Sequence, residues 1–210
     1  MTLTELNRRH QLSFDEYVEE WRSLIALFYF RALHPELTEQ DLGLNSTSVV
    51  NYSMELSAAL IYVAMSIWAL NRVVPADSRN RVSSAVVEQF YKDLHNGLSP
   101  KSQAEWTALC KKRQDAYAEV YNNLACADIN KRREDVGALA QELVGRISSR
   151  HETLNARAIK RIGNILILAT SAFKELADHS EPDAEVVRGK PRFILNKQAN
   201  PNVIASRWDR

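Results

Sequence analysis

An uncharged segment in the first third of the chain most constrains how the protein folds. From Leu42 to Asn71 the only charged residue is Glu55, and the part from Leu56 onward has no charge at all. A helix that is apolar on every side is surrounded either by other helices or by lipid. The uncharged run would rise only about 24 Å, whereas the hydrocarbon layer of a bilayer is about 30 Å thick. We therefore expect a helix at the centre of a protein core and no membrane span.

Glu55 stands where this uncharged run begins, so its carboxylate is expected at the edge of the core. A buried carboxylate that has no partner is costly. We therefore predict that an arginine, a lysine or a backbone donor lies beside Glu55, or that its carboxyl group is protonated.

Low glycine and proline contents favour helix over most of the chain. Six glycines and six prolines occur in 210 residues, and three of the prolines follow residue 181. Apolar residues recur at steps of three and four, which is typical of the buried faces of helices. The expected helices begin at Ser13, near Ser46 or Ser48, at Asp77, at Ser99, near Arg133 or Glu134, and at Ser149. We predict an all-α fold, a single bundle of about six helices around the central apolar helix.

The pattern changes after His179, where the helical stripes end. Glu181 to Glu185 reads as an acidic linker, and residues 188–210 carry six basic side chains and one acidic side chain. The chain is therefore predicted to consist of a helical bundle at 1–179 and of a linker with an irregular basic C-terminal arm at 180–210. The uncharged middle of the sixth helix, Ile162 to Phe173, is expected to pack against the central helix.

Charge and cysteine usage limit the class of protein. Residues 1–60 hold nine acidic and four basic side chains, a balance of −5, and residues 61–210 hold 17 and 23, a balance of +6. Cys110 and Cys126 are expected on one helix about 24 Å apart, too far for a disulfide. No signal-peptide pattern occurs at Met1 to Arg22, so a reducing cytoplasm is expected. No zinc-site spacing, Glu-x-x-His pair or glycine-rich phosphate loop is present, so no metal or cofactor is expected.

Basic residues recur along one side of the predicted sixth helix. Arg150, Arg157 and Arg161 are spaced by seven and four, Lys160 lies beside them, and Arg146 joins them if the fifth and sixth helices are continuous. Such a row suits successive phosphates of a nucleic acid, or another anionic partner. The alternative is the solvated outer face of an amphipathic helix, because the net charge of the whole chain is only +1.

The C-terminal arm alternates basic and apolar residues. Arg192 precedes the apolar triplet Phe193, Ile194 and Leu195, and Trp208 follows near the end. Three uses are open: folding back on the bundle, docking onto a partner protein, or lying along a nucleic acid with an aromatic ring stacked on a base. Because an apolar triplet is not expected to stay in water, these five residues are candidates for partner docking.

Arg146 and His151 have the one spacing in the chain that suggests catalysis. The segment Arg146-Ile-Ser-Ser-Arg-His151 resembles the arginine–histidine pair of HEPN-type ribonucleases, which are small all-helical proteins. The resemblance implies metal-independent cleavage of RNA, with the histidine as acid–base catalyst and the arginine stabilising the oxyanion. The polar residue that usually follows the arginine in that family is Ile147 here.

A helix-turn-helix interpretation of Leu37 to Tyr52 fails, because Thr38 to Gly43 is too short for its first helix and its second would be the apolar core helix.

The leading prediction is a non-catalytic interaction or assembly subunit that binds another protein or a larger assembly, with a nucleic-acid-handling complex as one setting. The alternatives are a HEPN-like ribonuclease using Arg146 and His151, and a nucleic-acid-binding protein using the basic face of the sixth helix.

Overall fold

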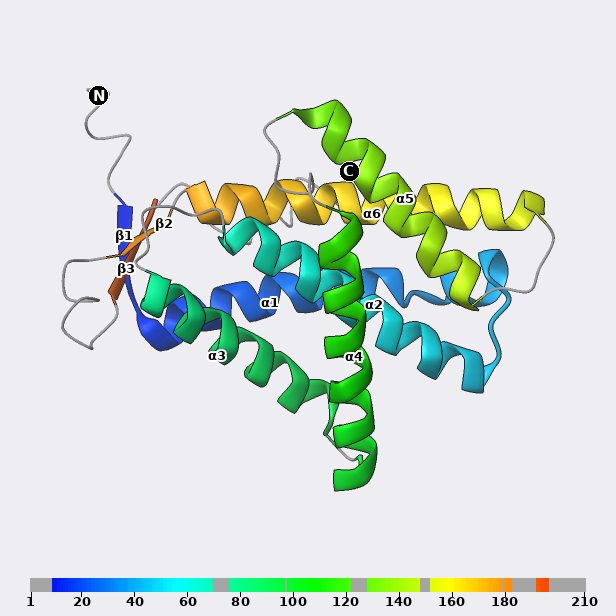
Figure 1. Ribbon diagram of the computed structural model, residues 1–210, viewed down its shortest axis with the longest axis horizontal. Coiled ribbons are helices and arrows are strands. Elements are labelled where there is room, and N and C mark those ends of the chain that lie inside the picture. Colours follow the sequence, from blue (N-terminus) through cyan, green and yellow to red (C-terminus); the bar gives the residue numbers. More distant parts are fainter. Residues whose placement is uncertain are drawn as a thin grey trace.

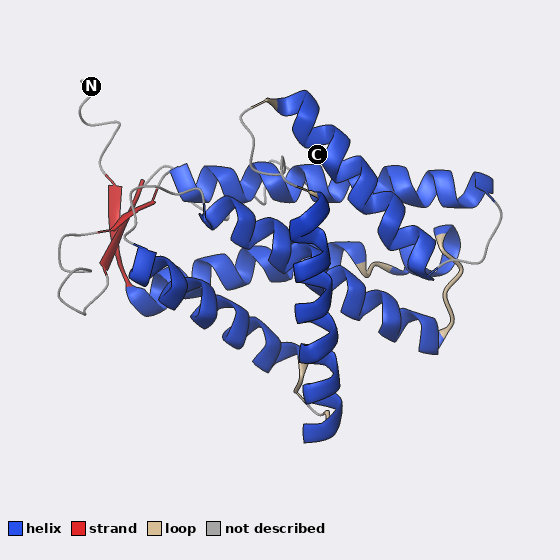
Figure 2. Cartoon of the chain, viewed as in Figure 1, coloured by secondary structure: helices blue, strands red, loops and turns tan. Residues whose placement is uncertain are grey.

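A computed structural model shows a bundle of helices with a small antiparallel sheet at one end (Figures 1 and 2). It describes residues 9–69, 76–96, 98–121, 128–147, 152–178, 180–182 and 192–196. The predicted all-α bundle is confirmed. Its elements, in chain order, are β1 (Arg9–Ser13), α1 (Phe14–Ala32), the π-helix η1 (Glu36–Asp41), α2 (Ser46–Ala69), α3 (Ala76–Leu94), α4 (Pro100–Val120), α5 (Ile129–Ile147), α6 (Glu152–Asp178), β2 (Ser180–Pro182) and β3 (Arg192–Asn196).

Helix α2 lies at the centre of the bundle, as the uncharged segment predicts. It contacts α1, α3, α4, α5 and α6. From Leu56 to Ala64 every residue except Tyr62 is fully buried. The part Ser48–Ala69 is the one described helix that is long and apolar enough to cross a membrane, but most of it is buried inside the bundle. Such burial is typical of a core helix packed against other helices.

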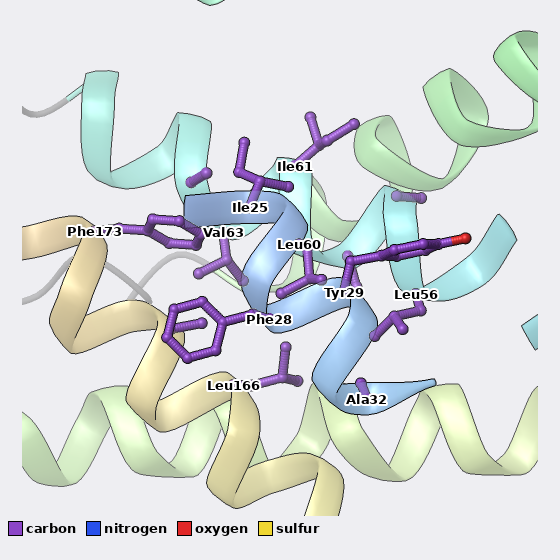
Figure 3. Packing of buried hydrophobic residues seen from close by; sticks show 14 of the residues in the cluster. Ile25, Phe28, Tyr29, Ala32, Leu56, Leu60, Ile61, Val63, Leu166 and Phe173 are labelled. Atoms are coloured by element: carbon purple, nitrogen blue, oxygen red, sulfur yellow. The ribbon is translucent and has the colours of Figure 1, made fainter. Parts of the chain in front are cut away.

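Helices α1 and α6 pack on α2 through large apolar side chains (Figure 3). Phe28 of α1 and Phe173 of α6 meet edge to face, with ring centroids 6.0 Å apart. The ring of Trp21 stacks on Phe173 at 5.8 Å. Helices α2 and α6 also contact each other directly, so the predicted contact between the central helix and α6 is present.

Capping side chains set where several helices begin. Ser99 accepts a hydrogen bond from the backbone N–H of Ser102 at 3.2 Å, and Pro100 fills the first turn of α4, as expected. For α2 the cap is Asn45, whose Oδ1 accepts from Ser48 N at 2.9 Å. Helix α5 begins one turn earlier than predicted because Asp128 Oδ1 accepts from Asn130 N at 2.9 Å.

The π-helix η1 connects α1 to α2 and is held to the core by buried leucines. Leu42 N donates to Leu37 O at 2.9 Å, which is the wider hydrogen bond of a π-turn. Leu37 and Leu42 are each 1% exposed. Gly43 then reverses the chain with a φ of 60°, a value that favours glycine.

The sheet joins the start of α1 to the C-terminal segment. Strand β3 is its middle strand and pairs antiparallel with β1, from Arg9 opposite Asn196 to Ser13 opposite Arg192, and with β2. The arm was predicted to be irregular, but its residues 192–196 form this strand, because β1 and β2 supply the backbone hydrogen bonds that an isolated apolar triplet lacks. Of the predicted acidic linker from Glu181 to Glu185, the first two residues belong to β2, and residues 183–185 lie outside the described residues.

Candidate functional site

Two arginines of the predicted basic face converge on one buried carboxylate. Arg157 Nε donates to Asp41 Oδ1 at 3.0 Å, and Arg161 Nη1 donates to Asp41 Oδ2 at 2.6 Å. The side chain of Asp41 is only 2% exposed. Arg161 Nη2 also donates to Glu36 Oε2 at 2.9 Å, and this ion pair raises the pKa of Arg161 and lowers the pKa of Glu36. The acidic side chains of η1 therefore occupy guanidinium groups that the sequence assigned to an anionic partner.

The other members of the basic face differ in their surroundings. Lys160 is exposed and makes no ion pair with a described residue, whereas Arg146 Nε donates to Glu142 at 3.1 Å. Burial would raise the pKa of Glu142, but hydrogen bonds from Tyr121 and Arg146 outweigh that effect and lower it. Arg150 and His151 lie outside the described residues, so the predicted Arg146–His151 pair stays a prediction.

Glu55 has the partner that the sequence argument required. Arg113 of α4 donates from Nε to both carboxylate oxygens, at 2.9 and 2.8 Å, and from Nη2 to Oε1 at 2.8 Å. Glu55 is 6% exposed. Of the alternatives predicted for Glu55, an arginine is the one present, and this ion pair joins α4 to the middle of α2.

The arm residues named as docking candidates are only partly described. Arg192, Phe193, Ile194 and Leu195 belong to β3, so their backbone folds back on the bundle by pairing with β1 and β2. Trp208 lies outside the described residues. Docking of these side chains onto a partner remains a prediction.

A groove between α3 and α4 was not predicted from the sequence. The two helices diverge from their connection, because α3 packs on α1 while α4 packs on α2 (Figure 1). The space between them measures about 860 Å³. It is lined on α3 by Ser84, Val87, Glu88, Tyr91 and Lys92, directly after α3 by His95 and Asn96, and on α4 by Gln103, Thr107, Lys111, Gln114 and Asp115. On each helix these residues recur mainly at steps of three and four, so they form a second regular face beside the one that packs on the core. This spacing is the sequence signal from which the groove could have been predicted.

His95 closes the groove where the two helices meet. Its ring stacks on Tyr91 at 5.4 Å and meets the edge of Trp106 at 5.6 Å. His95 is 7% exposed, and within the described part of the chain its Nε2 has no hydrogen-bond partner. Burial lowers the pKa of His95, so the imidazole is held neutral.

This burial predicts that the protein loses stability on acidification. Below the ordinary histidine pKa of about 6.5 the unfolded chain takes up a proton that folded His95 resists. The contribution of neutral His95 to the free energy of unfolding is complete above that pH and is lost as the pH falls toward the lower pKa of the folded state. Denaturant midpoints measured from neutral to mildly acidic pH should fall less in His95→Gln than in the wild type. A slope in His95→Gln equal to that of the wild type would contradict the prediction.

Other chemistry is limited in the described residues. No three histidine, cysteine or carboxylate side chains come together there as a metal site. Cys110 is fully buried and near Ser57, and burial raises the pKa of its thiol. A thiol held protonated in this way is a poor nucleophile.

Comparison of this chain with protein-family models, with curated proteins and with solved structures finds no match.

Proposed function

We propose that the protein is a non-catalytic helical subunit that binds another protein, and that the groove between α3 and α4 receives a helix of that partner. The groove carries the proposal, because two neighbouring helices present regular faces to it. They meet at its floor, where Gln114 Nε2 donates to the hydroxyl of Tyr91 at 3.3 Å, and diverge from there (Figure 1). Ser84 to His95 spans about 16 Å of helix, which suits a partner helix of roughly three turns. Grooves between helices are a recurring way of binding amphipathic helices.

The charges of the groove indicate what kind of helix fits. Glu88 and Lys92 stand one turn apart on α3, and Lys111 and Asp115 stand one turn apart on α4. None of the four forms an ion pair or hydrogen bond with a described residue. A partner helix with an apolar stripe for Val87 and Tyr91, and with acidic and basic residues on both sides of that stripe, complements these charges.

Two adjacent lysines allow a matched test. Lys111 lines the groove, whereas Lys112 is exposed on α4 outside it. Affinity purification from the native cell should recover a defined partner with the wild type and with Lys112→Glu. Recovery should fall about tenfold or more with Lys111→Glu, because reversing a charge places like charges together. The same partner recovered equally with both variants, or no partner with any form, would reject the proposal.

Nucleic-acid binding is the second candidate, supported by Lys160 and by the 66% exposed side chain of Arg157 on one face of α6. It predicts an affinity for RNA or DNA that falls steeply with salt. The affinity should also weaken when Arg150, Arg157 and Arg161 are replaced by glutamine. Binding that is independent of salt would count against it.

The alternative that Arg146 and His151 form a ribonuclease site can be tested directly. If His151 is the acid–base catalyst, the purified protein should cleave RNA in the presence of a chelator. Replacing His151 by alanine should then lower the rate by about 10²–10⁴, the usual contribution of a positioned acid–base group. His10→Ala serves as the control. Cleavage that persists in His151→Ala would reject the assignment.

A further inference from the structure

A second hollow lies beside Arg161. It measures about 380 Å³ and is formed by the end of α1, by η1 and by α6. Its lining combines Arg31 and Arg161 with Glu36, Asn164 and the apolar side chains of Ile165 and Leu168. This volume falls at the lower end of the range of about 300–1,000 Å³ that is usual for small-molecule sites.

The guanidinium of Arg161 is held rigidly from one side. Its Nη1 donates to Asp41 Oδ2 at 2.6 Å, and Asp41 is itself 2% exposed and bound by Arg157 at 3.0 Å. Buried ion pairs of this kind fix the orientation of a side chain, because breaking them leaves a buried charge unpaired. Arg161 therefore presents the remaining part of its planar group in a fixed direction.

The remaining edge of Arg161 is only half occupied. The Nε and Nη2 groups point to the same side of a guanidinium and together bind the two oxygens of one carboxylate or phosphate. Here Nη2 donates to Glu36 at 2.9 Å, whereas Nε has no hydrogen bond to a described residue. One oxyanion could take both donors if Glu36 moved away.

Glu36 is suited to be displaced, unlike Asp41. Its side chain is 55% exposed, and ion pairs at such exposure are weak. Two arginines, Arg31 and Arg161, and one carboxylate, that of Glu36, line the hollow. The amide of Asn164 adds a further donor, and Ile165 and Leu168 offer an apolar wall.

We propose that this hollow binds a small organic anion. Its carboxylate or phosphate group sits on the Nε–Nη2 edge of Arg161 and its apolar part lies against Ile165 and Leu168. Glu36 occupies the edge when the site is empty. This inference is independent of the groove between α3 and α4, so either can fail without the other.

The test uses the full chain and four probes: phenyl phosphate, benzoate, inorganic phosphate and the neutral benzyl alcohol. Binding is followed by NMR through the Nε–H resonances of the arginines. Phenyl phosphate or benzoate should shift the resonance of Arg161 in a saturable way, and the tighter of the two identifies the anionic group. Inorganic phosphate and benzyl alcohol should each bind more weakly than the better aromatic anion.

Variants separate the site from the fold. Glu36→Gln should tighten binding of the aromatic anion about two- to fivefold, the range that an exposed ion pair contributes. Glu39→Gln removes a neighbouring exposed carboxylate of η1 and should leave affinity unchanged. Arg161→Lys should abolish the tight binding, whereas Arg157→Lys, which also weakens the hold on Asp41 but does not line the hollow, should preserve it.

Several results would overturn the proposal. They are no saturable shift of Arg161 with any anion at millimolar concentration, equal binding of benzyl alcohol, and equal affinities of wild type and Glu36→Gln. Equal loss of binding in Arg157→Lys and Arg161→Lys would also overturn it, since the effect would then belong to the fold.

Discussion

Replacing Arg113 by methionine is expected to lower the free energy of unfolding by about 3–5 kcal/mol. The substitution keeps most of the apolar stem of the side chain but removes the three short contacts to the carboxylate of Glu55. Within the described residues Arg113 is the one hydrogen-bond donor to Glu55, which is 6% exposed. The variant therefore leaves a buried carboxylate unpaired, and denaturant unfolding measures the loss.

The double variant Glu55→Leu with Arg113→Met distinguishes the ion pair from the general packing of α4. Removing both charges replaces the pair by apolar contacts, which is often neutral in buried sites. We expect the double variant to recover most of the stability lost in Arg113→Met. If the stability losses of the single variants Glu55→Leu and Arg113→Met simply added in the double variant, the Glu55–Arg113 pair would not be the contact that fixes α4 on α2.

Replacing Phe173 by alanine should also lower the free energy of unfolding by about 3–5 kcal/mol. Phe173 is fully buried and touches the rings of Trp21 and Phe28 where α1, α2 and α6 meet (Figure 3). The variant loses the burial of the ring and leaves a cavity that the surrounding large side chains cannot fill. Thermal or denaturant unfolding provides the measurement.

Phe30 supplies the matched control for Phe173. It is an aromatic residue of α1 that is 66% exposed, so Phe30→Ala should change the free energy of unfolding by no more than about 0.5 kcal/mol. Comparable losses in the two variants would mean that the core is not centred on the contact of α1 with α2 and α6.

The core was predictable because burial leaves a local signature in the sequence. The uncharged run from Leu56 and the uncharged middle of α6 each have to be surrounded by protein, so their contact followed from the sequence. The same logic required a donor for Glu55, although it did not identify Arg113, which lies 58 positions away. Periodicity shows which face is buried and leaves open which distant residue meets it.

Features that depend on how the helices cross were not predictable in this way. Val120 has an apolar side chain near the end of α4 and yet is 62% exposed, whereas its neighbours Tyr117 and Tyr121 are buried. The hydroxyl of Tyr62 on α2 donates to Tyr121 O at 2.9 Å, so the last turn of α4 packs on α2 through a side that does not include Val120. The convergence of Arg157 and Arg161 on Asp41 depends on how η1 is seated on α6. The groove arises because α3 packs on α1 whereas α4 packs on α2. The sequences of α3 and α4 show only that each helix has a second regular face.

A photo-crosslinking amino acid placed at position 107 or at position 108 tests the central claim most directly. Thr107 lines the groove between α3 and α4, whereas Ala108 is exposed on the adjacent face of α4. Illumination in the native cell should give a discrete cross-linked product with one protein from position 107, and that product should be absent from position 108. Equal products from the two positions, or no product from position 107, would contradict the assignment of the groove as the partner-binding surface.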